Sequence, residues 1–127
     1  MELKQKTKIF LISLIATLIL LRLFLTFSPS TNLNFFGHNI HHLFIGSFLV
    51  VVVLVFFISN IVNKFTIILA GIGSALVLDE IVYLIATDGN DVSYLSYVSL
   101  LGVIILTAII IILTIILYSF NKQKSIK

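Results

Sequence analysis

The sequence has no cysteine and no tryptophan, a single proline, and few charged residues. The absence of cysteine excludes disulfides, iron–sulfur clusters, thiolate zinc sites and thiol nucleophiles. The absence of tryptophan leaves tyrosine and phenylalanine as the aromatic residues available at a membrane interface. Charged residues make up 10% of the 127 residues, whereas about a quarter is usual in a soluble domain. The composition therefore indicates a chain that is not surrounded by water.

Hydrophobic residues make up 60% of the chain. A soluble fold of this length could not bury so much apolar surface, so we expect lipid to cover it. Four apolar runs reach the roughly 20 residues that a spanning helix needs; they cover residues 9–27, 38–59, 65–86 and 94–120. The sequence predicts an all-α, polytopic protein of the cell (plasma) membrane, with four transmembrane helices in an antiparallel bundle and one membrane domain over residues 1–127.

The first run has a rival interpretation as a secretory signal peptide, because basic residues precede it. The run is longer than the apolar core of such a peptide, and Arg22 interrupts it. The following Ser28-Pro29-Ser30 also lacks the small-x-small pattern of a cleavage site. We therefore interpret this run as an uncleaved spanning helix.

The lysines indicate an orientation. With four spans, the outer loops carry Asp88 and Asp91 but no lysine or arginine, and every lysine lies on the opposite side: Lys4, Lys6, Lys8, Lys64, Lys122, Lys124 and Lys127. Positive residues are retained in the cytoplasm, so both termini are predicted to be cytoplasmic. Because topology explains the basic residues, no nucleic acid is expected. The expected partners are the lipid bilayer and either a second copy or another membrane protein.

Asp79 and Glu80 are adjacent carboxylates inside the third run. An acid at the centre of a membrane helix costs about 2.5–3.5 kcal/mol, and less near the surface, so we expect both to have partners. At about 1.5 Å per residue, they lie roughly 10–12 Å below the outer end of their run. Arg22 lies about 7–8 Å below the outer end of the first run by the same rise. The topology therefore places these three residues in the same leaflet.

Three histidines open the second run at that outer surface. His38, His41 and His42 stand at i, i+3 and i+4, so they share one face if the helix has begun by His38. Small residues let membrane helices approach closely. On the third run such a stripe consists of Gly71, Ser74 and Ala75 together with Leu78. We expect this stripe to bring the second and third helices, and hence the histidines and acids, together.

This His/acid cluster has three interpretations. The favoured one is a structural polar cluster, in which Arg22 neutralises an acid: Arg22, Asp79 and Glu80. The second is one divalent ion of zinc, iron or manganese, held by imidazoles and a carboxylate: His38, His41, His42 and Glu80. The third is proton handling by a desolvated carboxyl group. Adjacent residues point about 100° apart on a helix, so we expect Glu80 to face the histidines and Asp79 to face Arg22.

The fourth run carries no charge and shows no polar face, so we expect it to face lipid or another copy. The segment Asp88-Gly89-Asn90-Asp91 begins like a calcium loop but lacks the later ligands and the closing glutamate. We predict a solvated turn there.

Two motifs resemble a family of small prokaryotic integral membrane proteins. The first is the stretch from Asn39 to Gly46, similar to an H-x-H-H motif with a glycine four residues on. The second is the glycine-rich run from Gly71 to Glu80, which ends L-x-L-D-E and is followed by the D-x-x-Y element Asp91-Val92-Ser93-Tyr94. The sequence departs from the pattern at Asn39, where the family has a histidine, and His38 lies one position earlier. The resemblance covers residues 37–96; it implies a membrane location and a histidine–acid motif, and it lends no activity.

The favoured function is a structural or interaction role of an integral membrane protein with an outer-leaflet His/acid cluster. One alternative is a metal-dependent membrane enzyme acting on a lipid or another outer-leaflet substrate. The other is a small ion or proton-coupled transporter that works as an oligomer. The inner halves of the last three runs offer little that is polar beyond Ser59, Thr66 and Thr114, which argues against a polar path within one copy. The sequence names no catalytic residue.

Overall fold

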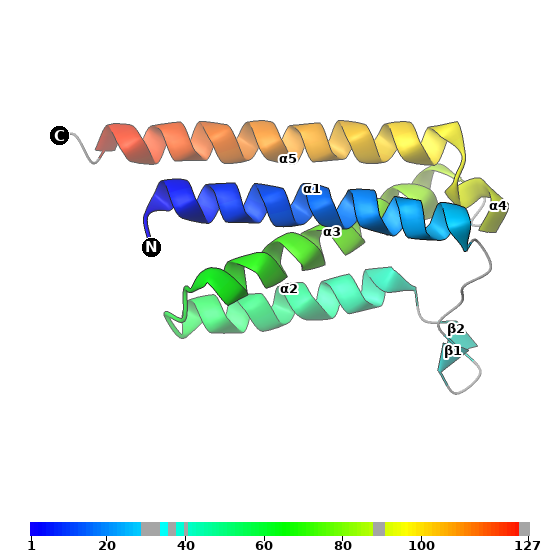
Figure 1. Ribbon diagram of the computed structural model, residues 1–127, viewed down its shortest axis with the longest axis horizontal. Helices are drawn as coiled ribbons and strands as arrows, with labels where there is room; N and C mark the ends of the chain where they lie inside the picture. The colour runs from blue at the N-terminus through cyan, green and yellow to red at the C-terminus, as the bar shows by residue number, and fades with distance from the viewer. Residues whose placement is uncertain (29–33, 36–37, 40, 88–90, 125–127) are drawn as a thin grey trace.

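The computed structural model describes residues 1–28, 34–35, 38–39, 41–87 and 91–124. These residues form four long helices: α1 (Leu3–Phe27), α2 (His42–Ile58), α3 (Lys64–Ala86) and α5 (Tyr97–Lys124). A one-turn helix, α4 (Asp91–Tyr94), precedes α5, and two two-residue strands, β1 (Asn34–Phe35) and β2 (His38–Asn39), pair antiparallel before α2 (Figure 1). The dominance of long helices confirms the predicted all-α class.

Three of the long helices, α1, α3 and α5, are long and apolar enough to cross a membrane. Helix α2 is also strongly apolar but has 17 residues, which is the short end of the range of about 17–25 that can span. Large apolar side chains point outward, with Leu20 65%, Phe48 68% and Leu117 62% exposed. Such extensive exposure would be unfavourable in water, and a bilayer removes that penalty. The chain is therefore a helical membrane protein.

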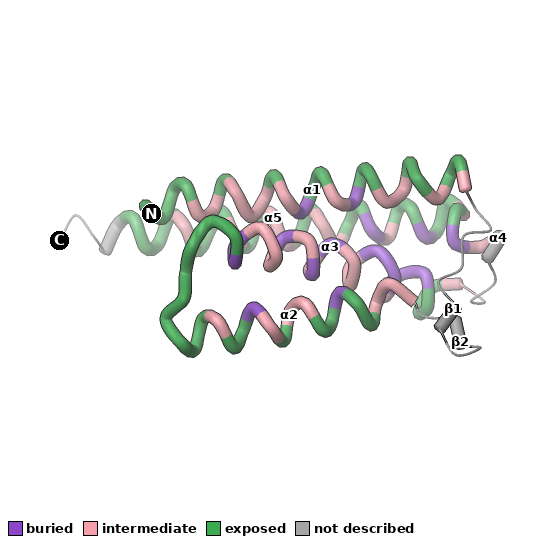
Figure 2. Tube along the Cα trace, turned by 60° about the horizontal axis from the view of Figure 1, so that its bottom comes forward, coloured by how far each residue is buried: buried purple, intermediate pink, exposed green. Residues whose placement is uncertain are grey.

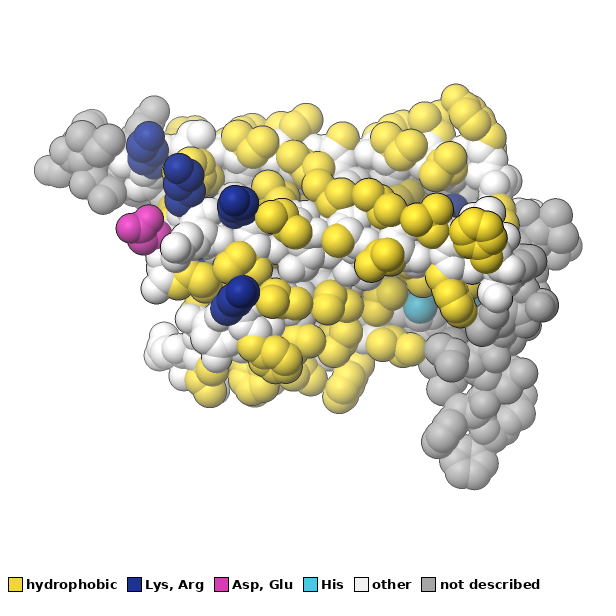
Figure 3. Space-filling model, viewed as in Figure 1, with side chains coloured by type: hydrophobic (Ala, Val, Ile, Leu, Met, Phe, Trp, Pro, Cys, Tyr) yellow, Lys and Arg dark blue, Asp and Glu magenta, His cyan; other side chains and the backbone are white. Residues whose placement is uncertain are grey.

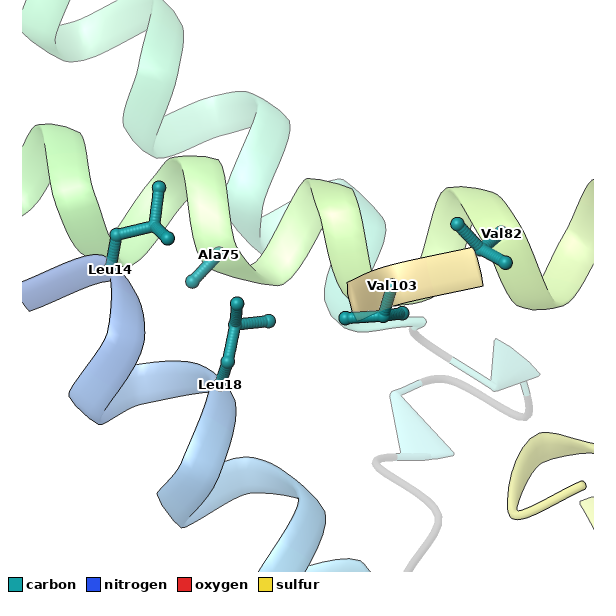
Figure 4. Close-up of a cluster of buried hydrophobic side chains, with 5 residues drawn as sticks. All are labelled: Leu14, Leu18, Ala75, Val82 and Val103. Carbon is teal, nitrogen blue, oxygen red and sulfur yellow. The ribbon is translucent and has the colours of Figure 1, made fainter. Parts of the chain in front are cut away.

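Helix α3 is the centre of the fold and packs against α1, α2 and α5. Figure 2 shows that the buried positions concentrate along it. The hydrophobic core joins Leu14 and Leu18 of α1, Ala75 and Val82 of α3, and Val103 of α5 (Figure 4). Because Leu14 and Ala75 are fully buried, α1 and α3 meet without a gap at mid-length.

The contact between α2 and α3 is made by glycines. A Cβ atom on Gly46 would lie 2.8 Å from the Leu76 Cβ and 2.9 Å from the Gly73 carbonyl oxygen. A Cβ on Gly73 would lie 3.1 Å from the Gly46 carbonyl oxygen. The two backbones therefore approach each other where neither carries a side chain. This contact places His42, one turn before Gly46, beside the turn of α3 that carries Glu80.

The predicted small-residue stripe on α3 faces α1 rather than α2. A Cβ on Gly71 would lie 2.6 Å from the Ser13 Cβ, and Ala75 packs in the core with Leu14. The small residues of the stripe do allow a close helix contact, as predicted. The predicted partner helix, α2, was wrong. The reason is that α3 has small residues on two faces, and the α2 face uses Gly73 instead.

Local chemistry explains the short turn between α2 and α3. Asn60 has a positive φ of 58°, a conformation that asparagine tolerates better than most residues. Asn63 then caps α3: its side chain accepts from the Thr66 N–H at 3.0 Å, and the Thr66 hydroxyl accepts from the Asn63 N–H at 3.0 Å. The left-handed Asn60 follows the end of α2, and the reciprocal capping box starts α3 three residues later.

The two termini lie at the same end of the molecule, away from β1, β2 and α4 (Figure 1). In Figure 3 most of the visible lysine and arginine side chains gather at that end, and apolar side chains cover the length of the helices.

Several helix boundaries differ from the predicted spans. Helix α1 begins at Leu3 rather than residue 9, and α5 ends at Lys124 rather than residue 120. The second span was expected from residue 38, but β2 occupies His38–Asn39 and His41 is the extended residue that precedes α2. The fourth span was expected from residue 94, but Tyr94 ends α4 and α5 begins at Tyr97. Asp91, predicted to lie in a turn, begins α4; the rest of that turn, residues 88–90, lies outside the described residues.

Candidate functional site: a buried cluster of charged residues

All four long helices and α4 contribute to one buried group of polar side chains at the end of the molecule away from the termini. We call it the polar cluster, and its members are Arg22, His41, His42, Asp79, Glu80, Tyr94 and Ser99. The two acids, both on α3, are 0% and 1% exposed. Ionised carboxylates are almost never so buried unless they are paired.

Asp79 is bonded from three directions. The Nε of Arg22 donates to its Oδ1 at 2.5 Å. The Nε2 of His42 lies 3.1 Å from its Oδ2, and the Tyr94 hydroxyl donates to the same oxygen. These partners come from α1, α2 and α4, so one carboxylate links α3 to three other helices.

Arg22 uses the rest of its guanidinium group on the segment that leads into α5. One Nη donates to the Tyr94 carbonyl oxygen at 2.9 Å, and the other donates to the Ser99 hydroxyl at 3.0 Å. The guanidinium carbon also lies 4.5 Å from the centre of the Tyr94 ring, within the range of a cation–π contact. With the bond to Asp79, every nitrogen of the guanidinium group has a partner, which fixes α1 against α3, α4 and α5.

Glu80 binds the start of α2. Its Oε1 lies 2.5 Å from the Nδ1 of His41, and its Oε2 lies 2.8 Å from the Nδ1 of His42. The backbone N–H of Leu43 donates to Oε2 at 3.0 Å. The first N–H groups of a helix have no partner within the helix, and the helix dipole favours an anion there. His41, the N-cap residue, makes no side-chain cap, so Glu80 caps α2 from the neighbouring helix.

His42 bridges the two acids. Its Nε2 faces Asp79 and its Nδ1 faces Glu80. A neutral imidazole donates from only one nitrogen, whereas an imidazolium donates from both. The geometry therefore fits a protonated His42 between two carboxylates. In that state the charges of Arg22 and His42 balance those of Asp79 and Glu80.

His41 is the member of the polar cluster that reaches furthest toward the surface. Its side chain is 37% exposed, compared with 19% for His42 and 2% for Glu80. Because Nδ1 faces Glu80, the carboxylate orients the ring and turns Nε2 away from the buried acid.

The structure brings together five residues that the sequence singled out: Arg22, His41, His42, Asp79 and Glu80. Glu80 faces His41 and His42, and Asp79 faces Arg22; Asp79 additionally reaches His42, which the sequence did not indicate.

The predicted helical face of three histidines was wrong. His38 lies in β2, before the helix begins, and its side chain lies outside the described part of the structure. Among the residues that the structure describes, no group of three or more His, Asp or Glu side chains is arranged to hold a metal ion. In the described cluster, His42 and both acids direct their nitrogen and oxygen atoms at each other.

Two members of the polar cluster, Tyr94 and Ser99, were missed. Most of α5 is exposed on the outside of the bundle, as expected of the fourth run, but Ser99 near its start faces Arg22. Tyr94 could have been found, because it ends the D-x-x-Y element that follows the acidic pair. Ser99 is fully buried and accepts from Arg22, but nothing in the sequence marks it. Other helical serines, such as Ser13 and Ser119, bond to a carbonyl oxygen of their own helix.

In comparisons with known proteins, no protein-family model, no curated protein and no solved structure matches the chain. The function therefore has to be argued from the geometry of the polar cluster and from the distribution of charge.

Proposed function

We propose that the chain is a multi-pass integral protein of the plasma membrane with a structural or interaction role. In this proposal its four long helices span the bilayer as an antiparallel bundle, both termini are cytoplasmic, and the polar cluster is a brace in the outer leaflet. The gathering of lysines at the end that carries both termini supports the orientation, because positive residues are retained in the cytoplasm (Figure 3).

One observation carries the proposed brace: each carboxylate oxygen of the acidic pair has a partner from another part of the chain. Oδ1 and Oδ2 of Asp79 bond to Arg22, His42 and Tyr94. Oε1 and Oε2 of Glu80 bond to the start of α2. Satisfied charges in a low-dielectric environment stabilise this arrangement of helices, since moving the helices apart would leave buried charges unpaired.

The side chains that pack on the inner side of the polar cluster favour a brace over a transport path. Next to it lie the apolar core around Leu18 and Ala75 and the glycine contact between Gly46 and Gly73. A backbone contact with no room for a Cβ also has no room for a water chain. A path for ions would therefore need an interface between copies.

His41 is the observation that favours the alternative role in metal-dependent chemistry. An imidazole oriented by a carboxylate through one nitrogen, with the other turned outward, is typical of metal-ligating and catalytic histidines. Further ligands would have to come from outside the described cluster, for example from a substrate or a second copy.

Elemental analysis combined with unfolding distinguishes the two roles. The protein is purified in mild detergent without chelator or nickel resin, beside a His41→Ala/His42→Ala variant. A brace predicts no stoichiometric metal in either protein and a less stable variant. A matched control is Thr26→Ala, because within the described residues the Thr26 hydroxyl bonds to the Arg22 carbonyl oxygen of its own helix and to no side chain of the polar cluster. About one zinc, iron or manganese per chain in the parent, lost in the variant, would reject the brace in favour of the enzyme.

The orientation has its own test. Reporter domains that are active only in the cytoplasm are fused to the N-terminus and, separately, to the C-terminus. Both fusions should be active, and an active reporter at only one terminus would reject the four-span topology.

A further inference from the structure

A groove of about 240 Å³ opens between α1 and α5 near the two termini, far from the polar cluster. Its lining is mostly apolar and includes Leu3, Phe10 and Leu117. Ile67 of α3 is the most buried of its lining residues, at 5% exposed. The groove is therefore an open, mostly apolar depression between α1 and α5, with Ile67 of the central helix among its lining residues.

One part of the groove is polar, and Lys6 is its charged member. The other lining residues with a polar group are Thr7, Thr114, Tyr118 and Asn121. Lys6 is partly buried, whereas Lys4 and Lys8 on the same helix are exposed. Lysines bury their apolar stem and keep the ammonium group at a polar surface.

The Lys6 ammonium forms no ion pair with any acid among the residues that the structure describes. The groove thus combines an apolar lining with an unneutralised cation. That combination is complementary to an amphiphile with a negative head and a hydrocarbon tail.

We propose that this groove binds one anionic phospholipid, with an acyl chain along the apolar lining and the phosphate at Lys6. The inference rests on the proposed orientation, which places the groove in the cytoplasmic leaflet. Anionic lipids concentrate in that leaflet and are attracted by basic residues next to spanning helices. A second copy of this chain fits the groove less well, because the lysines gathered at this end would face one another (Figure 3).

The experiment is native mass spectrometry of the full chain in detergent, titrated separately with dioleoyl phosphatidylglycerol and dioleoyl phosphatidylcholine. The parent should bind one phosphatidylglycerol in preference to phosphatidylcholine. Lys6→Gln should weaken phosphatidylglycerol binding about fivefold, the effect of one lysine at a membrane surface. Lys6→Arg should keep the binding. Lys8→Gln is the matched control, since it removes the same charge from the same helix outside the groove, and it should change nothing.

A second variant tests the apolar lining of the groove. Its result can be interpreted even if Lys6→Gln does not fold. Leu117→Trp enlarges an exposed side chain that lines the groove, so it should reduce phosphatidylglycerol binding with Lys6 still in place. Circular dichroism of each variant checks that helix content is unchanged.

Three results would overturn the inference. Equal losses in Lys6→Gln and Lys8→Gln would show diffuse attraction to the basic end. Equal binding of the two lipids by the parent would show that the head is not recognised. Displacement of phosphatidylglycerol by glycerol 3-phosphate at similar concentrations would show a site for a free anion. The titration uses solubilised protein, so its outcome is independent of the reporter experiment that tests orientation.

Discussion

The ion pair between Arg22 and Asp79 should carry a large part of the stability of this protein. Asp79 is fully buried, and its Oδ1 lies 2.5 Å from the Nε of Arg22. Asp79→Asn leaves the guanidinium group facing a neutral amide, and Arg22→Gln leaves a buried carboxylate without its strongest partner. Removal of one partner of a buried pair typically costs about 3–5 kcal/mol of unfolding free energy. We expect each single variant to lose stability in this range.

The double variant provides the sharper prediction. Arg22→Gln/Asp79→Asn removes both charges, so neither is left uncompensated. If the single costs simply added, the double variant would lose about 6–10 kcal/mol. We expect it to lose little more than either single variant, which corresponds to a coupling energy of about 3–5 kcal/mol. An ordinary hydrogen bond between membrane helices couples by only about 0.6 kcal/mol, so the magnitude identifies the charge pair.

The assay is equilibrium unfolding by SDS in mixed micelles, followed by far-ultraviolet circular dichroism because the chain has no tryptophan. The parent, the two single variants and the double variant are measured together, with Thr26→Ala as the control at the same end of α1. Single-variant losses that add to within about 0.5 kcal/mol in the double variant would refute the reasoning, because uncoupled sites behave in that way.

Three further predictions use the same titration. Gly46→Ala should force α2 away from α3 and cost about 1–3 kcal/mol, and an unchanged midpoint would contradict the close backbone contact. Tyr94→Phe keeps the ring but loses the hydroxyl bond to the Asp79 carboxylate, so about 1.5–3 kcal/mol should be lost; a neutral effect would mean that this bond contributes nothing. His42→Gln should destabilise more than His41→Gln, because His42 bonds both acids and His41 bonds one, and the reverse order would show that the bridge is unimportant.

Much of the fold could be predicted because lipid imposes strict conditions on a sequence. Backbone N–H and C=O groups in a bilayer need internal partners, so a long apolar run has to be helical. The four runs match four long helices, although α2 and α5 begin later than expected. The first residue of a helix is harder to predict than its apolar middle. The residues around His41 are polar and lie at the end of the apolar run, so either an extended or a helical backbone suits them.

Part of the site was also predictable. Depth along each run placed Arg22 in the same leaflet as Asp79 and Glu80, and a charge in lipid has to find a charge of opposite sign. The different directions of the two acids followed from the step of about 100° between neighbouring residues of a helix. These arguments need only the geometry of the helix and the cost of burying a charge, and neither depends on the tertiary structure.

By itself, the sequence determined that this is a helical membrane protein and that its buried charges must be paired, because both follow from the free energy of moving residues from water into lipid. Only the tertiary structure decided which faces of α3 meet α1 and α2, and that Tyr94 and Ser99 complete the pairing of Arg22. Glycines and serines occur on several faces of these helices, and their sequence context does not distinguish them. Packing selects among those faces, since the observed arrangement lets the backbones touch at Gly46 and Gly73 and pairs the buried charges.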